Sequence, residues 1–399
     1  MKGFKLFILF VFISSAGFAQ GAGSYRGVLK LPNGSEVPFN FEIKNNNAYF
    51  INGKEHFAAS GLRKVNDSLF INFDQFDNEL ALKIEGKQLT GLLRKKDGSG
   101  HATSVTATYG DTYRFRDKGK KPAGDITGKY DVSFERAGES DENKVGLFKQ
   151  EGNKLYATFL SISGDSRYLE GIVEGNSFYL SSFIGSGPAY YTGTFDNSGH
   201  VTGTANGRSF KALKNVNAAL PDPYKLTYLK DGYTTFDFSL PDINGNNVSL
   251  KDDQFRNKVV IVTIGGTWCP NCMDEAAFMA PWYEKNKNRG LAIVGVQFER
   301  KMDQAYVHKA MENFKNRFGI GYTEVFGGLA DKNAVAQAFP ALNTFLSFPT
   351  ILFIDKKGKV DQIYTGFTGP ATGNYYQQFI EDFNEEIDKL LAEKFKRHG

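Results

Sequence analysis

The chain of 399 residues contains two cysteines, and both lie in the tetrapeptide Cys269-Pro270-Asn271-Cys272. A disulfide between them would close a very small loop and would therefore add little stability by restricting the unfolded chain. Disulfide exchange, by contrast, needs a partly ionised thiol and a second thiol close enough to resolve the mixed disulfide. The spacing favours this chemistry over an inert structural bridge, which stays the alternative interpretation.

The sequence around the pair predicts that it lies where a buried strand meets a helix. Residues 259–264 form a continuous apolar run, typical of a strand buried on both faces of a parallel sheet, and a helical stretch runs from Cys272 towards Lys287. Unpaired N–H groups and the helix dipole would then face the sulfur of Cys269 and favour its ionised form. Pro270 suits the first helical turn because it has no N–H to leave unsatisfied.

Other uses of the cysteines fit less well. A zinc site would need two further ligands, but there is no second cysteine pair, and the five histidines are scattered: His56, His101, His200, His308 and His398. A c-type haem would need a histidine directly after Cys272, where Met273 stands. Because the sequence carries no nucleotide, flavin or metal motif, we expect the cysteine pair to be the only redox centre, with no cofactor and no metal.

Glu275 follows Cys272 by three positions, so the two side chains are expected on one face of the helix. There the carboxylate could take or return the proton of the Cys272 thiol. An acid in the first turns of a helix is equally explained by the helix dipole. Both interpretations stay open, and Asp274 is expected to be the solvated acid of the two.

The first residues indicate where the protein goes. Lys2 and Lys5 precede the apolar residues 6–13, and the small residues Gly17 and Ala19 complete a predicted signal peptide over residues 1–19. The apolar run is far shorter than the ~20 residues that cross a bilayer, which disfavours an uncleaved anchor. No later stretch is predicted to span a membrane. We expect a soluble protein of the periplasm or cell envelope.

Composition limits the partners and requires more than one domain. Removing Lys2 and Lys5 lowers the formal charge from +4 to +2, and no basic block accompanies it, so nucleic acid is an unexpected partner. The chain is too long for one ordinary domain, and 41% hydrophobic residues suffice for several cores.

Residues 20–217 are predicted to be all-β, a sandwich or a barrel, because short alternating runs are separated by turn clusters. Three pairs of similar segments indicate two β units, 24–117 and 126–214, as a duplicated pair: Gly27 with Gly128, residues 67–71 with 176–180, and residues 89–91 with 201–203. Residues 218–232 form a predicted linker. Strands and helices then alternate over residues 233–399, which predicts an α/β layer.

Two motifs of the α/β part resemble those of a known superfamily. The segment Thr267-Trp268-Cys269-Pro270-Asn271-Cys272 after a buried strand, together with Phe348-Pro349-Thr350 before a later one, is similar to the thioredoxin superfamily. More narrowly, the chain resembles the exported TlpA/ResA-like thiol-disulfide oxidoreductases over residues 234–394. Some relatives also carry β domains at the N-terminal side.

The resemblance implies a role for each motif residue. Cys269 would be the attacking thiolate, Cys272 the resolving thiol, and Glu275 a proton acceptor for Cys272. Pro349 would be a cis proline, and the backbone of Phe348 would pair with an extended substrate segment. The remaining residues that would contact substrate in these motifs are Trp268 and Thr350.

Two departures from the superfamily pattern stand out. Thr263 occupies the place of the buried aspartate of thioredoxins proper, which leaves Glu275 as the better proton acceptor. Gly265 and Gly266 replace the usual bulkier residues. They could leave room beside the disulfide or merely loosen the loop, and the sequence does not decide between these.

The leading functional hypothesis is reduction of disulfides in other exported proteins, with electrons from a membrane or periplasmic thiol donor. One alternative is a binding module for a lipid, glycan or protein in the β region, served by the thioredoxin-like domain. A thiol peroxidase is disfavoured, because Val262 and Gly266 stand where that chemistry usually places Pro and Thr. The substrate, the oligomeric state and the redox direction are not determined by the sequence.

Overall fold

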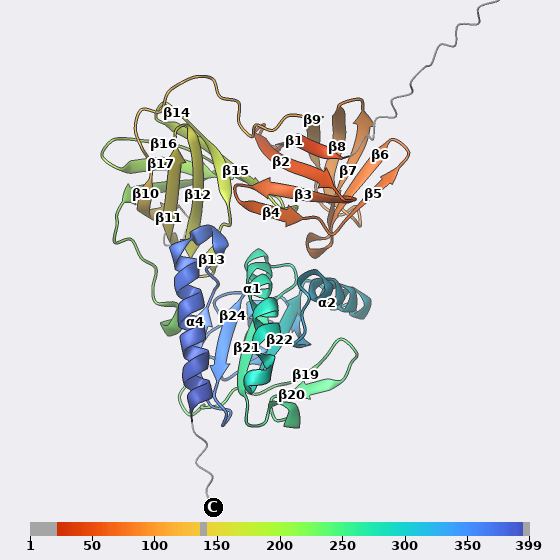
Figure 1. Ribbon diagram of the computed structural model, residues 1–399, viewed down its shortest axis with the longest axis vertical. Coiled ribbons are helices and arrows are strands. Elements are labelled where there is room, and N and C mark those ends of the chain that lie inside the picture. The colour runs from red at the N-terminus through yellow and green to blue at the C-terminus, as the bar shows by residue number, and fades with distance from the viewer. Residues whose placement is uncertain (1–21, 136–141, 394–399) are drawn as a thin grey trace, which may run out of the picture.

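The computed structural model describes residues 22–135 and 142–393, which form two β units and an α/β domain (Figure 1). The predicted signal peptide, residues 1–19, lies outside the described residues. Among the described residues, no helix combines the length and apolar character needed to cross a membrane.

The first β unit is an antiparallel meander whose first and last strands also pair, in the order β4-β3-β2-β1-β9-β8-β7-β6-β5. Over the described residues the order ends at β4 and β5, so the sheet is an open half-barrel. Its strands are β1 (Gly23–Lys30), β2 (Glu36–Lys44), β3 (Asn47–Asn52), β4 (Glu55–Ala58), β5 (Gly61–Val65), β6 (Ser68–Phe73), β7 (Asn78–Glu85), β8 (Gln88–Lys95) and β9 (Thr103–Tyr109).

The second β unit repeats this order with every label raised by nine, and the additional pairing of β12 with β14 closes it into an eight-stranded barrel. Its strands are β10 (Gly128–Phe134), β11 (Glu142–Glu151), β12 (Lys154–Ser161), β13 (Gly164–Asp165), β14 (Leu169–Glu174), β15 (Ser177–Phe183), β16 (Pro188–Phe195), β17 (His200–Ala205) and β18 (Arg208–Lys214). The all-β prediction is therefore confirmed, in the barrel form. The three pairs of similar segments fall on β1 and β10, β6 and β15, and β8 and β17, which hold equivalent places. This placement supports the duplication, which stays a prediction.

Phe183, at the end of β15, fills the open half-barrel of the first unit. Its ring centroid lies 4.7 Å from that of Phe39 and 5.3 Å from that of Phe50. Asn52 fixes it by donating from Nδ2 to the Phe183 carbonyl and accepting from its N–H, both at 3.1 Å. The half-barrel core is therefore completed by a side chain from the second unit.

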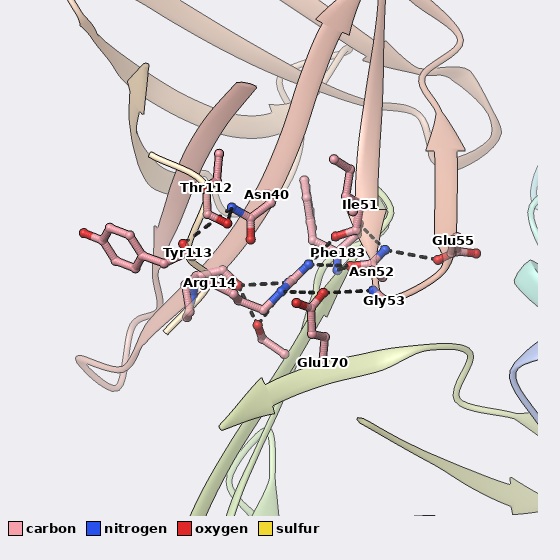
Figure 2. Close-up of polar contacts among 12 residues, drawn as sticks. Asn40, Ile51, Asn52, Gly53, Glu55, Thr112, Tyr113, Arg114, Glu170 and Phe183 are labelled. Atoms are coloured by element: carbon pink, nitrogen blue, oxygen red, sulfur yellow. Dashed lines mark hydrogen bonds and ion pairs between the residues drawn. The ribbon is translucent and has the colours of Figure 1, made fainter. Parts of the chain in front are cut away.

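Arg114, in the connection between the β units, ties them together a second time (Figure 2). Its buried guanidinium donates to the carbonyl of Ile51 in the first unit and, at 3.2 Å, to Ser181 Oγ in the second. Glu170 lies 3.5 Å from Arg114 Nε and accepts from the N–H of Gly53 at 2.9 Å. Burial lowers the pKa of Arg114, and the charge of Glu170 opposes that shift. The two β units therefore meet in a polar as well as an apolar interface.

The α/β domain has the predicted alternation of strands and helices around a sheet of order β23-β22-β21-β24-β25. β21 and β22 pair in parallel, as do β22 and β23, whereas β24 runs antiparallel to β21 and to β25. The elements are β19 (Ser239–Pro241), β20 (Asn247–Ser249), β21 (Val259–Gly265), α1 (Pro270–Asn286), β22 (Leu291–Glu299), α2 (Gln304–Phe318), β23 (Thr323–Leu329), α3 (Lys332–Ala338), β24 (Thr350–Ile354), β25 (Val360–Thr365) and α4 (Asn374–Ala392). This arrangement is the thioredoxin-like fold that was expected.

Apolar residues of the helices decide which face of this sheet each one covers. Met279 of α1 and Phe383 of α4 pack with Ile351 of β24 on one face, and Val335 of α3 packs on the other with Phe236, which precedes β19. The predicted linker, residues 218–232, contains the 3-10 turn Pro223–Lys225, whose Tyr224 ring lies 4.9 Å from that of Tyr364. Domain boundaries at these positions stay predictions.

Candidate active site at the amino end of α1

Cys269 caps the amino end of α1, directly after the buried strand β21. Its extended backbone and its side chain form the N-cap, and its Sγ accepts a hydrogen bond from the N–H of Cys272 at 3.3 Å. Pro270 occupies the first helical turn, as predicted. Both cysteines are free thiols and buried, with exposed fractions of 5% for Cys269 and 2% for Cys272.

The two thiols differ in their electrostatic surroundings. Burial, then the hydrogen bond and charge of Cys269, and then the charge of Glu275 raise the pKa of Cys272 well above its ordinary value, against a lowering by the N–H of Gly266. Cys272 therefore keeps its proton at neutral pH in the reduced protein. This is the state expected of a thiol that must not attack first.

Glu275 is enclosed together with the cysteines. Its Oε1 is buried without a hydrogen-bond partner, and burial, then the charge of Cys269, raise its pKa well above the usual range. A carboxyl in this position holds a proton to higher pH than an exposed glutamate does. The predicted proximity to the thiols is present, and the predicted catalytic role stays a proposal.

The prediction that Asp274 is solvated was wrong. Asp274 Oδ2 lies 2.6 Å from Nη1 of Arg167, and its side chain is only 13% exposed. Arg167 comes from the turn that enters β14, in the second β unit, and the same Nη1 donates to the carbonyl of Pro270 at 2.8 Å. Burial by itself would lower the pKa of Arg167, but the charges of Asp274 and Glu55 outweigh it and raise that pKa.

The peptide bond between Phe348 and Pro349 is cis, and it lies beside Cys269. The thiol of Cys269 donates to the carbonyl oxygen of Phe348 at 3.7 Å, which also accepts from Ser347 Oγ at 3.0 Å. Thr350 is buried and donates from Oγ1 to the carbonyl of Ser347 at 2.8 Å. The fold therefore brings the two predicted motifs together from positions 79 residues apart.

Trp268 packs against the same segment. Its ring meets that of Phe348 edge-on at 5.7 Å, its Nε1 donates to the carbonyl of Phe298 at 2.9 Å, and the guanidinium of Arg300 lies 5.1 Å from the indole. Gly266 makes this packing feasible, because a Cβ there would lie 2.5 Å from Trp268 Nε1 and 2.6 Å from the carbonyl oxygen of Phe298. Gly266 is therefore explained by close packing against Trp268, which is neither of the two alternatives that the sequence left open.

Sequence reasoning missed a buried carboxyl near the motif. Glu299 accepts from the N–H of Thr267 at 3.1 Å and from its Oγ1 at 3.0 Å, and burial raises the pKa of Glu299 to about 7. A glutamate that ends the apolar strand β22 was a signal that could have drawn attention to it.

It also missed a segment of the second β unit that reaches the site. The carbonyl oxygen of Ser163 accepts from Nδ2 of Asn271 at 3.2 Å and from Oγ of Ser347 at 3.3 Å. No local pattern in the sequence predicts these two hydrogen bonds.

The fold and the Cys-Pro-Asn-Cys site define a thioredoxin-like oxidoreductase. Residues 232–363 match the model of the AhpC/TSA family. The chain is 34% identical over 136 residues to the thiol-disulfide oxidoreductase ResA of Geobacillus kaustophilus (strain HTA426), covering 34% of this chain and 69% of the relative. It is 30% identical over 154 residues to ResA of Bacillus subtilis (strain 168), and this match covers 38% of this chain and 77% of the relative. The chain belongs to the ResA family of thiol-disulfide oxidoreductases.

Solved structures also match this chain. A thiol-disulfide oxidoreductase from Bacteroides fragilis NCTC 9343 is 21% identical, with a TM-score of 0.28, and covers 37% of this chain and 99% of its own. A thiol:disulfide interchange protein of the thioredoxin family from Chlorobium tepidum TLS is 23% identical, with a TM-score of 0.30. The match covers 41% of this chain and 100% of that protein's chain.

Proposed function

We propose that this protein is exported and reduces disulfides in other envelope proteins through Cys269 and Cys272. The proposal rests above all on the thiol of Cys269, which caps a helix and lies 3.7 Å from the carbonyl that precedes the cis proline Pro349. Extended substrate segments pair with that backbone in the superfamily this chain resembles. A disulfide carried by such a segment would be presented to Cys269.

Two exchange steps transfer two electrons to the substrate. The Cys269 thiolate attacks one substrate sulfur, the substrate disulfide breaks, and the other sulfur leaves as a thiolate that takes a proton. Cys272 then loses its proton and attacks the Cys269 sulfur, which releases the second substrate thiol and leaves a Cys269–Cys272 disulfide. A second thiol protein, in the envelope or its membrane, must return two electrons. We propose the cysteine pair as the only redox centre.

Glu275 is proposed to accept the Cys272 proton in the second step. The carboxyl shares the buried space of the two sulfurs, and its charge is one of the influences that raise the pKa of Cys272. Its own raised pKa makes it a stronger base than an exposed glutamate once it is ionised. Trp268, Phe348, Pro349 and Thr350 are proposed to shape the substrate groove.

The β region is proposed to position substrates rather than to hold a ligand. Aromatic side chains of the barrel's own strands pack in its interior, as Phe148 does with Phe159 and Phe178 at ring-centroid distances of 5.5 Å and 5.9 Å. The half-barrel is occupied by Phe183. A lipid or glycan module therefore remains the weaker alternative, and Val262 and Gly266 still disfavour a peroxidase.

The reduction potential of the Cys269–Cys272 pair tests the proposed direction. The full-length protein is equilibrated against dithiothreitol or glutathione, and alkylated thiols are counted by mass spectrometry. A value near thioredoxin's ~−270 mV, with reduction of insulin disulfides, supports the reductase. A value near ~−120 mV would make it an oxidant of the DsbA kind, and the absence of a reversible couple would make the pair structural.

A further inference from the structure

Residues 161–167, the loop that contains β13, lie against the amino end of α1 and against the loop that carries Pro349 (Figure 1). They belong to the second β unit, about a hundred residues before the cysteines. We refer to them as the β13 loop. Its contacts involve the segment between the two cysteines and the segment that precedes Pro349.

One carbonyl of the β13 loop accepts hydrogen bonds from both of these segments. Ser163 O accepts from Asn271, which lies between the cysteines, at 3.2 Å and from Ser347, which precedes Phe348, at 3.3 Å. Cys269 itself contacts the Phe348 carbonyl at 3.7 Å. The main chain of the loop thus makes hydrogen bonds to the segments between which an extended substrate would lie.

The approach of the loop is too close for side chains. A Cβ on Gly164, whose φ is +130°, would lie 2.2 Å from Asn271 Nδ2 and 2.8 Å from the carbonyl oxygen of Phe367. A Cβ on Gly366 would lie 2.5 Å from the carbonyl oxygen of Ile162. Glycine at both positions lets backbone pack against backbone. Cys269, which lies two residues before Asn271, is only 5% exposed to solvent.

Arg167 fastens the loop through charged groups of two other elements. Its Nε donates to Glu55 Oε1 of β4 at 3.0 Å, and its Nη1 lies 2.6 Å from Asp274 Oδ2 of α1. The side chains of Glu55, Arg167 and Asp274 are 9%, 11% and 13% exposed. Asp165 adds a bond by accepting from the N–H of Gly369 at 2.7 Å.

The ion pairs of Arg167 can break without a large loss of stability. An ion pair that loses its partners on opening regains hydration, so a partly buried pair contributes less to stability than its geometry suggests. A cavity of about 310 Å³ adjoins the loop and is lined by residues that include Ile162, Gly164, Phe367 and Tyr375. The loop therefore has space into which it can move while the barrel stays folded.

We propose that the β13 loop is a built-in occupant of the substrate groove, held by Arg167, and that a protein substrate must displace it to reach Cys269. This inference rests on the proposed function, because it concerns access to the same thiol. The substrate class it implies is a disulfide on an extended protein segment, whose own carbonyl takes over the donors Asn271 and Ser347. Arg167 is a positioning residue for this access.

The test compares Arg167→Ala with Arg94→Ala, which removes another ion-paired arginine, the partner of Glu79 in the half-barrel. The reduced full-length protein reacts with iodoacetamide, and the modified cysteine is assigned by fragment-ion mass spectrometry. Rate constants are measured from pH 5 to 10, because the plateau reports access to the thiolate whereas the midpoint reports its ionisation. We expect the plateau for Cys269 to rise about tenfold in Arg167→Ala and to stay unchanged in Arg94→Ala, since loss of charge-assisted bonds is worth at least a factor of this size.

An unchanged plateau in a folded Arg167→Ala variant would overturn the proposal. If that variant loses its cooperative unfolding transition, Glu55→Ala replaces it, since this change removes one partner of Arg167 and leaves Asp274 in place. It must then show the rise. Insulin reduction is measured in parallel to separate the two proposals. If Arg167→Ala is alkylated faster but neither it nor the natural protein reduces insulin, the loop proposal is kept and the reductase proposal is rejected. If both proteins reduce insulin at equal rates and are alkylated at equal rates, the reductase proposal is kept and the loop proposal is rejected.

Discussion

Arg167 and Asp274 form an ion pair with 2.6 Å between Nη1 and Oδ2, and it joins the second β unit to the amino-terminal half of the helix that carries the cysteines. The same guanidinium donates to the carbonyl of Pro270, the residue after Cys269. A change in the β region therefore reaches the helix end through two bonds of one side chain. This coupling gives the β region a physical route to the redox site.

The roles of the cysteines can be told apart by trapping. Cys272→Ser should accumulate a mixed disulfide between Cys269 and a substrate protein, because the resolving thiol is gone. Cys269→Ser should form none, since the remaining Cys272 is buried and its pKa is raised well above the ordinary value. Non-reducing electrophoresis after incubation with oxidised insulin, followed by mass spectrometry, measures the adduct. Trapping by Cys269→Ser instead of Cys272→Ser would exchange the two roles.

The adjacent glycines provide a matched pair for packing. Gly266→Ala places a Cβ 2.5 Å from Trp268 Nε1 and 2.6 Å from a carbonyl oxygen, so we expect about 1–3 kcal/mol of lost stability and a shifted tryptophan emission. Gly265→Ala meets Cys272 Sγ at 3.4 Å, which is a tight contact that small shifts can relieve. Urea unfolding of both variants measures the difference. Equal losses would show that the indole does not depend on Gly266.

Local and periodic signals explain what could be predicted from the sequence. The apolar run of β21 and the following helical stretch placed Cys269 at a helix start, because both patterns extend over neighbouring residues. The resemblance then brought Pro349 to the site, and the cis bond and the contact with Phe348 are observed.

Contacts between distant segments explain what could not. Ser163 and Asn271 are 108 residues apart, and nothing in the composition of the β13 loop reveals its partner. The expectation for Asp274 failed for this reason, since Arg167 reaches it from another domain.

Phe183 should make the two β units unfold together. Phe183→Ala removes a ring that lies 4.7 Å from Phe39 and 5.3 to 5.8 Å from others of the half-barrel, so we expect a loss of about 3–5 kcal/mol. The half-barrel should then be cut first in limited proteolysis. Phe115→Ala is the control, because its ring lies against Tyr179, outside the half-barrel core. Equal protease resistance of both variants would contradict this role of Phe183.

Glu275 should make stability depend on pH in a defined direction. Burial, then the charge of Cys269, raise its pKa well above the ordinary 4.5, so the folded protein keeps a proton that the unfolded chain has already released. The folded state binds more protons in this window, and the free energy of unfolding must fall as the pH rises from about 4.5 through the folded pKa.

Glu275→Gln removes this loss, because the amide does not titrate. We expect the variant to exceed the natural protein in unfolding free energy at pH 7 and to match it below pH 4.5, where the folded and the unfolded natural protein both hold the proton. Urea unfolding of the reduced protein at pH 4, 5.5 and 7 measures it. Glu284→Gln, on the same helix with a side chain 45% exposed, is the control variant and should not reproduce the gain of Glu275→Gln at pH 7. A constant difference between the natural protein and Glu275→Gln at all three pH values would mean that Glu275 titrates normally, and Glu275 would then lose its place as the proton acceptor of Cys272.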